Sequence, residues 1–394
     1  MQFAAAFSLK RTYNMGLRRT LRKLFKKPEQ KNNNGILLNL YKTNYDKSVL
    51  ISYITPPFIT ENPFIHQNYI TSHIVAEAFS ELGYNIDIVD YNQRVCEPDY
   101  NNYAVIFGMG HQFESSFLAK NRDIPRVHFI TGAHQDLHNK MSLKSITDFY
   151  MLSGLWMPAE ANVLAESAYY GMYNADFSII LARGYVYEDC KNRFNNKLHS
   201  LNNNILGVFS TLKEKVKRTN NFLFLSGSRQ ITKGLHLLLE VARVRKDLNF
   251  YVVVPDIKIE LLTYYSDLFE GKTNVFLSKN LRMDGEEMKN IIESCSYVVA
   301  PSYVDGMPGG TIEPMSAGLV PIVSKYCGFP AEQFIFEMDE LSIDSLIVKI
   351  DELTSLKESD YLKLSKEVKA FADFNFSKNT VKQELLRILR SESL

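Results

Sequence analysis

Two acidic residues, Asp305 and Glu313, stand eight positions apart in a stretch rich in Gly and Pro. Gly309, Gly310 and Thr311 lie between them, at an expected helix start. Carboxylates accept hydrogen bonds from vicinal hydroxyls, and backbone N–H groups at a helix start bind anions. We therefore expect Glu313 to bind a ribose diol, Asp305 to hold sugar hydroxyls, and the three residues between them to bind the phosphate or the transferring sugar. For a single acid, interaction with the helix dipole is the alternative explanation.

A second turn, at residues 224–234, carries the cations Arg229 and Lys233 and begins with Gly227 after an apolar run. Backbone N–H groups and cations at such a turn favour a bound diphosphate. The turn is neither a Walker A loop nor a dinucleotide fingerprint, because GxxxxGK[ST] and GxGxxG are both absent. Alone, the turn is explained equally well as an ordinary strand–helix connection with surface cations. Together with the two acids it predicts a nucleotide-sugar site.

The acidic stretch closely resembles the nucleotide-sugar-binding signature of the retaining group-1, family 4-like glycosyltransferases, which have the GT-B fold. That family carries two acids eight positions apart, followed by an Ala-Met-Ala-x-Gly-x-Pro-Val-like segment. Here the match consists of Asp305, Glu313 and residues 314–323, and Gly328 and Glu332 match a later Gly-rich turn and the Glu after it. The first acid is usually Glu in the family, so this chain has a side chain shorter by one methylene.

The upstream turn resembles the same family in part. The family has Gly-Arg followed by Lys-Gly, whereas this chain has Gly227-Ser228 followed by Lys233-Gly234. Ser228 takes the usual Arg position, and Arg229 comes one residue late. The resemblance therefore assigns Lys233 to the diphosphate more firmly than Arg229.

The resemblance implies an enzyme that moves a sugar, with retention, from a nucleoside-diphosphate-sugar donor to a hydroxyl acceptor. It implies no cofactor and no metal, and the chain contains no Asp-x-Asp triplet of the metal-dependent kind. Cations and helix dipoles would then meet the charge of the leaving group.

Three histidines follow predicted strands of the first half, where the acceptor is expected. Retaining family members often place a His or an acid after a first-domain strand, facing the donor sugar, and His134 is the closest positional match. We therefore assign catalytic roles to His134 and Asp305, with His111 and His66 as further candidates. His is suited to proton handling near neutral pH, although a lone His is often a packed or solvated residue.

Aromatic residues gather at positions 150–173, including Trp156, Tyr169, Tyr170 and Tyr173. They could offer stacking faces to a sugar, but packing in the core is the favoured interpretation.

Short apolar runs alternate with helical stretches along the chain, which predicts an α/β protein with doubly wound parallel sheets. The expected strands are 49–54, 86–89, 103–107, 126–131, 175–182, 222–225, 250–254, 275–277, 297–300 and 319–323. Helices are expected from His66 to Gly83 and at 235–246, where Leu235, Leu238, Leu239 and Ala242 form an apolar stripe.

These elements predict two Rossmann-like domains that face a central cleft. The expected organisation is a basic amphipathic leader at 1–35, an N-terminal acceptor-side domain at 36–205, a linker at 206–220, a nucleotide-sugar-binding domain at 221–376, and a C-terminal helix at 377–394 that could cross back to the first domain. A chain of 394 residues is long enough for two domains with separate cores.

Charge is unevenly distributed: residues 1–35 hold nine Lys and Arg residues and one acid, Glu29, whereas the whole chain has a net charge of +1. Leu17, Leu21 and Leu24 fall at helical spacing among the cations. Residues 10–27 could therefore lie on an anionic membrane surface; a solvated leader and an organelle presequence are the alternatives. The folded remainder is acidic, so we expect no nucleic acid partner.

Four widely spaced cysteines without a CxxC pair favour a reducing compartment, which we take to be the cytoplasm. With a basic leader, the acceptor would be a glycan or a lipid-linked glycan in surface polysaccharide or glycolipid assembly, such as capsule or lipopolysaccharide. A nucleotide-sugar-binding protein without transfer activity is the main competing class. A Rossmann oxidoreductase is disfavoured by the absent GxGxxG.

Overall fold

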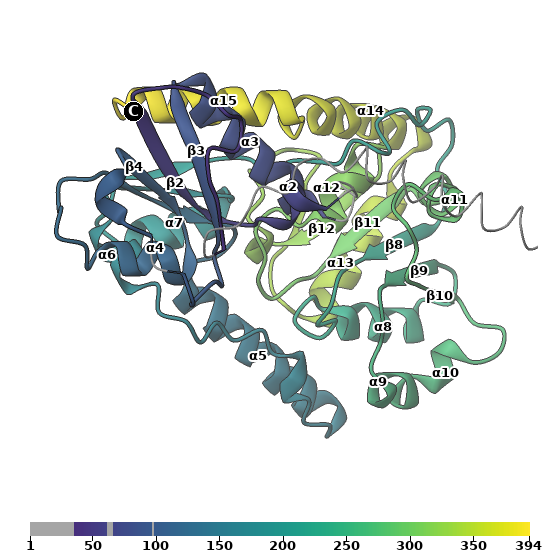
Figure 1. The fold of residues 1–394 in the computed structure, drawn as a ribbon. Helices are drawn as coiled ribbons and strands as arrows, with labels where there is room; N and C mark the ends of the chain where they lie inside the picture. Colours follow the sequence, from purple (N-terminus) through teal and green to yellow (C-terminus); the bar gives the residue numbers. More distant parts are fainter. Residues whose placement is uncertain (1–34, 61–65, 97) are drawn as a thin grey trace, which may run out of the picture.

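The computed structural model describes residues 35–60, 66–96 and 98–394, and contains two parallel sheets, each with its own layers of helices (Figure 1). The predicted α/β class with two Rossmann-like domains is confirmed. The predicted basic leader lies outside the described residues, apart from Gly35.

The first sheet has the strand order β1-β3-β2-β4-β5-β6-β7, and all of its strands are parallel except β1. Its strands are β1 (Ile36–Leu37), β2 (Lys47–Tyr53), β3 (Tyr84–Asp90), β4 (Val105–Gly108), β5 (Arg126–Ile130), β6 (Phe177–Ile180) and β7 (Leu198–Ser200). Val49 pairs with Ile86 on one side and with Val105 on the other. Consecutive apolar residues fit this position, because a central parallel strand is covered on both faces.

Helices cover the first sheet and connect its strands. They are α2 (Pro56–Ile59), α3 (Gln67–Glu81), α4 (Gly110–Ser116), α5 (Gln135–Ser153), α6 (Tyr169–Asn174) and α7 (Gly184–Arg193), with 3-10 turns at Tyr100–Asn102 and Pro158–Glu160. Helix α3 begins after His66, whose side chain accepts a hydrogen bond from the Asn68 N–H, and it ends before Gly83, which has a φ of +85°. A residue with positive φ after the last turn is a common helix stop.

The second sheet has the order β10-β9-β8-β11-β12-β13 and is parallel throughout. Its strands are β8 (Asn221–Leu225), β9 (Asn249–Val254), β10 (Val275–Lys279), β11 (Tyr297–Ala300), β12 (Val320–Ser324) and β13 (Phe336–Met338). This is the doubly wound Rossmann order, in which the chain reverses direction across the sheet between β8 and β11. Ligands bind such sheets at the carboxyl ends of the strands beside that reversal.

The helices of the second half include a strongly amphipathic α8, whose leucines are buried. They are α8 (Leu235–Val244), α9 (Ile259–Tyr264), α10 (Ser266–Phe269), α11 (Glu286–Ser294), α12 (Gly309–Met315), α13 (Ile343–Ser355), α14 (Glu358–Asn375) and α15 (Lys378–Ser391), with a 3-10 turn at Lys325–Cys327. All ten predicted strands are present, whereas β1, β7 and β13, of two or three residues each, were not predicted.

The C-terminal helix α15 packs on the first domain, although the chain before it belongs to the second (Figure 1). Leu385 and Leu389 are buried in the same apolar cluster as Phe79 of α3. Ion pairs from Lys378 to Glu77 (2.5 Å) and from Lys382 to Glu81 (2.5 Å) flank this contact. Helix α15 thus joins the two domains.

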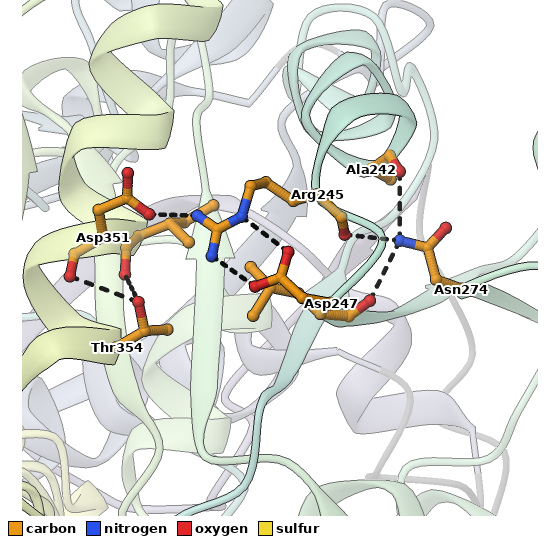
Figure 2. A network of polar contacts seen from close by, with 8 residues as sticks. Ala242, Arg245, Asp247, Asn274, Asp351 and Thr354 are labelled. Carbon is orange, nitrogen blue, oxygen red and sulfur yellow. Dashed lines mark hydrogen bonds and ion pairs between the residues drawn. The ribbon is translucent and has the colours of Figure 1, made fainter.

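A polar network closes the turn between α8 and β9 and attaches it to α13 (Figure 2). The Arg245 guanidinium donates to Asp247 (2.9 and 2.8 Å) and contacts Asp351 of α13. The Asn274 amide donates to the carbonyl groups of Arg245 (2.9 Å) and Ala242 (3.2 Å). These bonds stabilise the outer half of the second domain, remote from the strand ends that face the first.

Helix α5 extends from the first domain onto the second. Asp148 accepts a hydrogen bond from the Tyr303 hydroxyl (2.8 Å), and Ser145 Oγ lies 3.2 Å from Thr232 Oγ1. The Phe149 ring packs edge-on against a second-domain histidine, with centroids 5.5 Å apart. The two domains therefore meet through specific side chains beside the turn at residues 224–234.

Candidate active site

A cavity of about 740 Å³ lies between the two domains, at the carboxyl ends of the strands. The first domain lines it with the loops after β2, β3, β4 and β5 and with residues 162–168. The second domain lines it with the turn after β8, the loop after β11 and the start of α12. This is the position at which doubly wound sheets bind ligands, and its volume suits a nucleotide-sized molecule.

Lys233 and Asp305, both predicted site residues, form an ion pair on the cavity wall. Their side chains are 28% and 17% exposed, so both remain accessible from the cavity. Asp305 Oδ1 also accepts from the Gly306 N–H (3.1 Å), and the Asp305 N–H donates to the Tyr326 carbonyl (2.9 Å). An incoming phosphate would compete with Asp305 for Lys233, because both are anions that bind the same ammonium group.

Glycine is required at position 310, where α12 begins at the cavity floor, whereas at position 309 a side chain would have to displace the Gln67 amide. A Cβ on Gly310 would stand 1.9 Å from the Leu225 carbonyl oxygen, and a Cβ on Gly309 would stand 2.2 Å from the Gln67 side-chain nitrogen. Thr311 lines the cavity, but its N–H already donates to the Pro308 carbonyl (2.9 Å). Of the three amides predicted to bind the phosphate or the sugar, that of Thr311 is therefore occupied.

Arg229 lies on the cavity wall close to Gly227, but its guanidinium is hydrogen-bonded to the first domain. Arg229 Nη1 donates to the carbonyl groups of Ala159 (3.2 Å) and Ala161, and the residue has a left-handed φ of +66°. Its predicted contact with the diphosphate would require this guanidinium to exchange partners. Positive φ is unusual for a residue with a side chain and marks a locally constrained turn.

The first-domain loop at 158–161 makes further bonds to the same turn. Glu160 Oε2 accepts from the Ile231 N–H (3.1 Å), and Thr232 Oγ1 donates to the Glu160 carbonyl (2.7 Å). Burial of the Glu160 carboxyl raises its pKa, and the Ile231 hydrogen bond opposes that shift. The turn that carries Lys233 is thus positioned by an acid from the other domain, 71 residues earlier in the chain.

Glu313 is fully buried and does not line the cavity. Its Oε1 accepts from Gln67 Nε2 (3.1 Å) and from the Leu206 N–H, whereas its Oε2 has no hydrogen-bond partner among the described residues. Burial raises the Glu313 pKa to about 7. In this arrangement Gln67 lies between Glu313 and the cavity, and the predicted ribose contact would require Gln67 to move.

His134 is engaged on both ring nitrogens. Nδ1 accepts from the Leu137 N–H (3.4 Å) as the N-cap of α5, and Nε2 lies 2.6 Å from Asp189 Oδ2. The side chain has no exposure, and its ring packs edge-on against Phe194. His134 lines the cavity, but both of its ring nitrogens are engaged in this geometry, which is that of a helix cap, so its catalytic role stays a prediction.

A helix-capping role predicts the behaviour of two variants. His134→Ala should lower the free energy of unfolding in urea by about 1–2 kcal/mol, whereas His134→Asn should lose less, because Asn is a good N-cap. Transfer activity should survive in both variants at temperatures where they are folded. Loss of turnover in a fully folded His134→Asn protein would instead restore the catalytic assignment.

His66 and His111 both line the cavity. His66 Nδ1 accepts from the Asn68 N–H (3.2 Å), and burial lowers the His66 pKa, opposed by the nearby Asp305 carboxylate. His111 lies in the first turn of α4.

The sequence analysis missed several cavity residues, among them Gln67 and His138. No sequence motif marks Gln67 as a site residue, because its hydrogen-bond partner Glu313 is 246 residues away in the chain. His138 could have been found from spacing. It follows His134 by four residues, which places both on one face of a helix that starts at a strand end.

The aromatic residues at 150–173 are on the surface, so the interpretation of core packing was wrong. Trp156, Tyr169, Tyr170 and Tyr173 are all exposed. None of them lines the cavity.

Comparison with protein families found a match over residues 210–366 to the model described as glycosyl transferases group 1. The match covers the second domain, including both predicted donor-site turns. The comparison with curated proteins found no relative of this chain.

Solved structures with the same fold cover nearly the whole chain. Sucrose-phosphate synthase from Thermosynechococcus elongatus aligns with a TM-score of 0.57 at 13% identity, over 87% of this chain and 98% of that one. A glycosyltransferase from Rickettsia africae aligns with a TM-score of 0.56 at 12% identity, over 88% and 99%. HepE of Anabaena, solved in complex with UDP and glucose, aligns with a TM-score of 0.53 at 13% identity, over 88% and 100%. At these identities the likeness concerns the fold, and this chain has the two-domain GT-B fold, with a second domain that matches the group 1 glycosyltransferases.

Proposed function

We propose that this chain is a glycosyltransferase that moves a sugar from a nucleoside-diphosphate-sugar donor to a hydroxyl acceptor. The observation that carries the proposal is the interdomain cavity, where Lys233, Asp305, Gly309 and Gly310 meet on one wall. A diphosphate joined to a sugar needs a cation for its phosphates and a carboxylate for the sugar hydroxyls. It also needs glycines that let its phosphates approach the backbone closely. The group 1 family match to the same domain supports this choice.

In the proposed reaction Lys233 binds the diphosphate and stabilises the negative charge that develops on it as the sugar leaves. Asp305, released from Lys233, accepts hydrogen bonds from sugar hydroxyls. The first domain covers the opposite wall, which excludes water that would hydrolyse the donor. The resemblance to the retaining enzymes supports retention at the anomeric carbon and a reaction without a metal ion.

Surface polysaccharide or glycolipid assembly is the role we propose, with a glycan or lipid-linked glycan as acceptor. No helix in the described part of the chain is long and apolar enough to cross a membrane. The cluster of cations at residues 10–27 supports peripheral attachment to the inner, cytoplasmic face of an anionic membrane. Co-sedimentation with vesicles containing phosphatidylglycerol, but not with neutral vesicles, tests this attachment.

Release of nucleoside diphosphate tests the transfer reaction. The protein is incubated with UDP-, GDP-, ADP- and TDP-sugars, with and without a glycolipid extract, in buffer containing EDTA. We expect one donor to release its nucleotide faster when acceptor is present, and the product to keep the anomeric configuration by NMR. Tight donor binding with no transfer to any acceptor would favour the alternative of a nucleotide-sugar-binding protein.

A further inference from the structure

At the cavity the two domains touch through bare backbone. Gly132 follows β5 of the first domain, Gly306 follows β11 of the second, and both line the cavity. A Cβ on Gly306 would stand 2.3 Å from the Gly132 Cα and 2.9 Å from the Leu181 carbonyl oxygen. Both are main-chain atoms, which cannot turn aside as the end of a flexible side chain can. Position 306 therefore cannot carry a side chain while the domains keep this separation.

The backbone conformation of Gly306 does not itself require glycine. Its φ lies outside the left-handed region, so a residue with a side chain could adopt it. Gly184 and Gly328 also stand against the other domain, where a Cβ would lie 2.4 Å from the Phe329 carbonyl oxygen and 2.9 Å from the Ala182 Cβ. Both have a positive φ, of +52° and +68°, which favours glycine by itself. Of these three glycines, only Gly306 is kept bare by the interdomain contact alone.

The loop that holds Gly306 is fastened on its other side to the second domain. The Asp305 N–H donates to the Tyr326 carbonyl (2.9 Å), and the Met307 N–H donates to the Cys327 carbonyl (2.7 Å). The N–H of Gly306 itself donates to Asp305 Oδ1 (3.1 Å). Gly306 therefore lies between the first domain and the carboxylate that we assign to the donor sugar.

A hydrogen bond from the first domain ties the same loop a second time. Asn203 comes shortly after β7 and lines the cavity, and its side-chain amide donates to the Met307 carbonyl (3.0 Å). Its Oδ1 accepts from the Asn204 N–H (2.8 Å). Met307 is buried and has a φ of +44°, which is unusual for a residue with a side chain. Contacts from both domains thus hold residues 305–307 in one constrained conformation.

We propose that Gly306 is a positioning residue, whose bare Cα lets the first domain approach the Asp305 loop closely enough to set the distance between donor sugar and acceptor. An alanine at 306 needs about 3.5 Å between its Cβ and the Gly132 Cα, so it would hold the domains about 1 Å further apart. A misplacement of about 1 Å can cost about 100-fold in rate. The inference rests on the proposed function, because it needs a donor on the second domain and an acceptor on the first.

Donor binding and transfer should respond differently to Gly306→Ala. The added Cβ would point at Gly132 rather than into the cavity, and Lys233 would keep its place on the second domain. The donor Kd should therefore stay close to that of wild type, whereas transfer at saturating donor should fall about 100-fold. Gly132→Ala should lose far less, because its Cβ would stand 3.5 Å from the Gly306 nitrogen and 3.7 Å from the Gly306 Cα, which are ordinary contacts.

Calorimetric titration and rate measurements on the full chain test this difference. Titration with UDP-glucose, GDP-mannose and ADP-glucose gives the donor Kd. Acceptor-dependent release of nucleoside diphosphate, at saturating donor with a glycolipid extract, gives the transfer rate. Both are measured for wild type, Gly306→Ala, Gly132→Ala, Asn203→Ala and Gly271→Ala.

Two of these variants make the test independent of a general cost of substitution. Gly271→Ala is the control, because this exposed glycine of the second domain lies outside the cavity and an added Cβ there meets nothing within 4 Å. Asn203→Ala removes the hydrogen bond to Met307 without adding an atom, and should slow transfer about fivefold with little change in donor Kd.

We expect Gly306→Ala to bind donor as wild type does and to transfer about 100-fold more slowly, with Gly271→Ala unchanged in both. A wild-type transfer rate in folded Gly306→Ala would overturn the inference. Loss of donor binding in that folded variant would also overturn it, because Gly306 would then act on the donor and not on the separation of the domains. If Gly306→Ala does not fold, Asn203→Ala decides, and an unchanged transfer rate there would refute the proposal. A wild-type chain that binds no nucleotide sugar, or transfers none, would show instead that the proposed function fails.

Discussion

Replacing Lys233 by alanine is expected to lower kcat/KM about 100- to 1000-fold, the loss typical of removing one group that stabilises transition-state charge. Lys233 is the cation on the cavity wall whose ammonium group contacts a carboxylate of the same site, Asp305. Without it, the leaving diphosphate lacks a neutralising charge and Asp305 repels it. Initial rates of nucleoside-diphosphate release at several donor concentrations provide the measurement.

Two further variants separate this effect from a general loss of charge. Lys279→Ala removes an exposed cation at the end of β10, outside the cavity, and should leave kcat/KM unchanged. Lys233→Arg should recover part of the loss, because it keeps the charge with a different shape. A Lys233→Ala enzyme with wild-type kcat/KM would remove Lys233 from the donor site.

Replacing Glu313 by glutamine is expected to stabilise the protein at high pH and to weaken donor binding. The Glu313 pKa is raised from 4.5 to about 7 by burial. Between these values the native state binds more protons than the unfolded state, so this carboxyl makes stability fall as pH rises from 4.5 to 7. The difference in unfolding free energy, Glu313→Gln minus wild type, should therefore grow by about 3 kcal/mol from pH 4.5 to pH 8.

Urea denaturation at pH 4.5, 6 and 8 measures that difference. Glu270→Gln changes an exposed carboxyl of the same domain and should show no such growth. A constant difference for Glu313→Gln across pH would mean that the carboxyl is not buried as described. Gain of stability with loss of donor affinity would identify Glu313 as a residue kept for binding at the expense of stability.

Residues from the first domain contact several of the residues predicted to bind the sugar donor. Gln67 bonds Glu313 and lies against Gly309, and the Ala159 and Ala161 carbonyls hold Arg229. A donor that uses Glu313 or Arg229 must replace these contacts. Donor binding and the relative placement of the domains are therefore coupled through the same side chains.

The donor half of the site was predictable because its residues are close in sequence. Asp305 and Lys233 each belong to a short motif with its own turn glycines, and a strand precedes each motif, so both reach the same sheet edge. Their ion pair follows from the strand order, because β8 and β11 are neighbours in the sheet.

The remaining contacts depend on residues far apart in the chain, which spacing alone does not reveal. Glu313 is turned toward Gln67 and Leu206 rather than the cavity, and neither partner is near it in sequence. His134 follows a strand as a catalytic histidine would, yet its ring caps α5 and meets Asp189 of α7. A position at a strand end is thus predictable, whereas the direction of a side chain there depends on packing between helices.

Thermal-shift titration with UDP, GDP, ADP, TDP and their common sugars tests most directly whether this cavity binds a nucleotide sugar. At about 100-fold excess over Kd, binding should add about 2.7 kcal/mol of stability, which raises Tm by several degrees. The account predicts a rise in Tm with one nucleotide family for wild type, and a much smaller rise for Lys233→Ala. Folded wild-type protein whose Tm responds to none of these nucleotides would contradict the account.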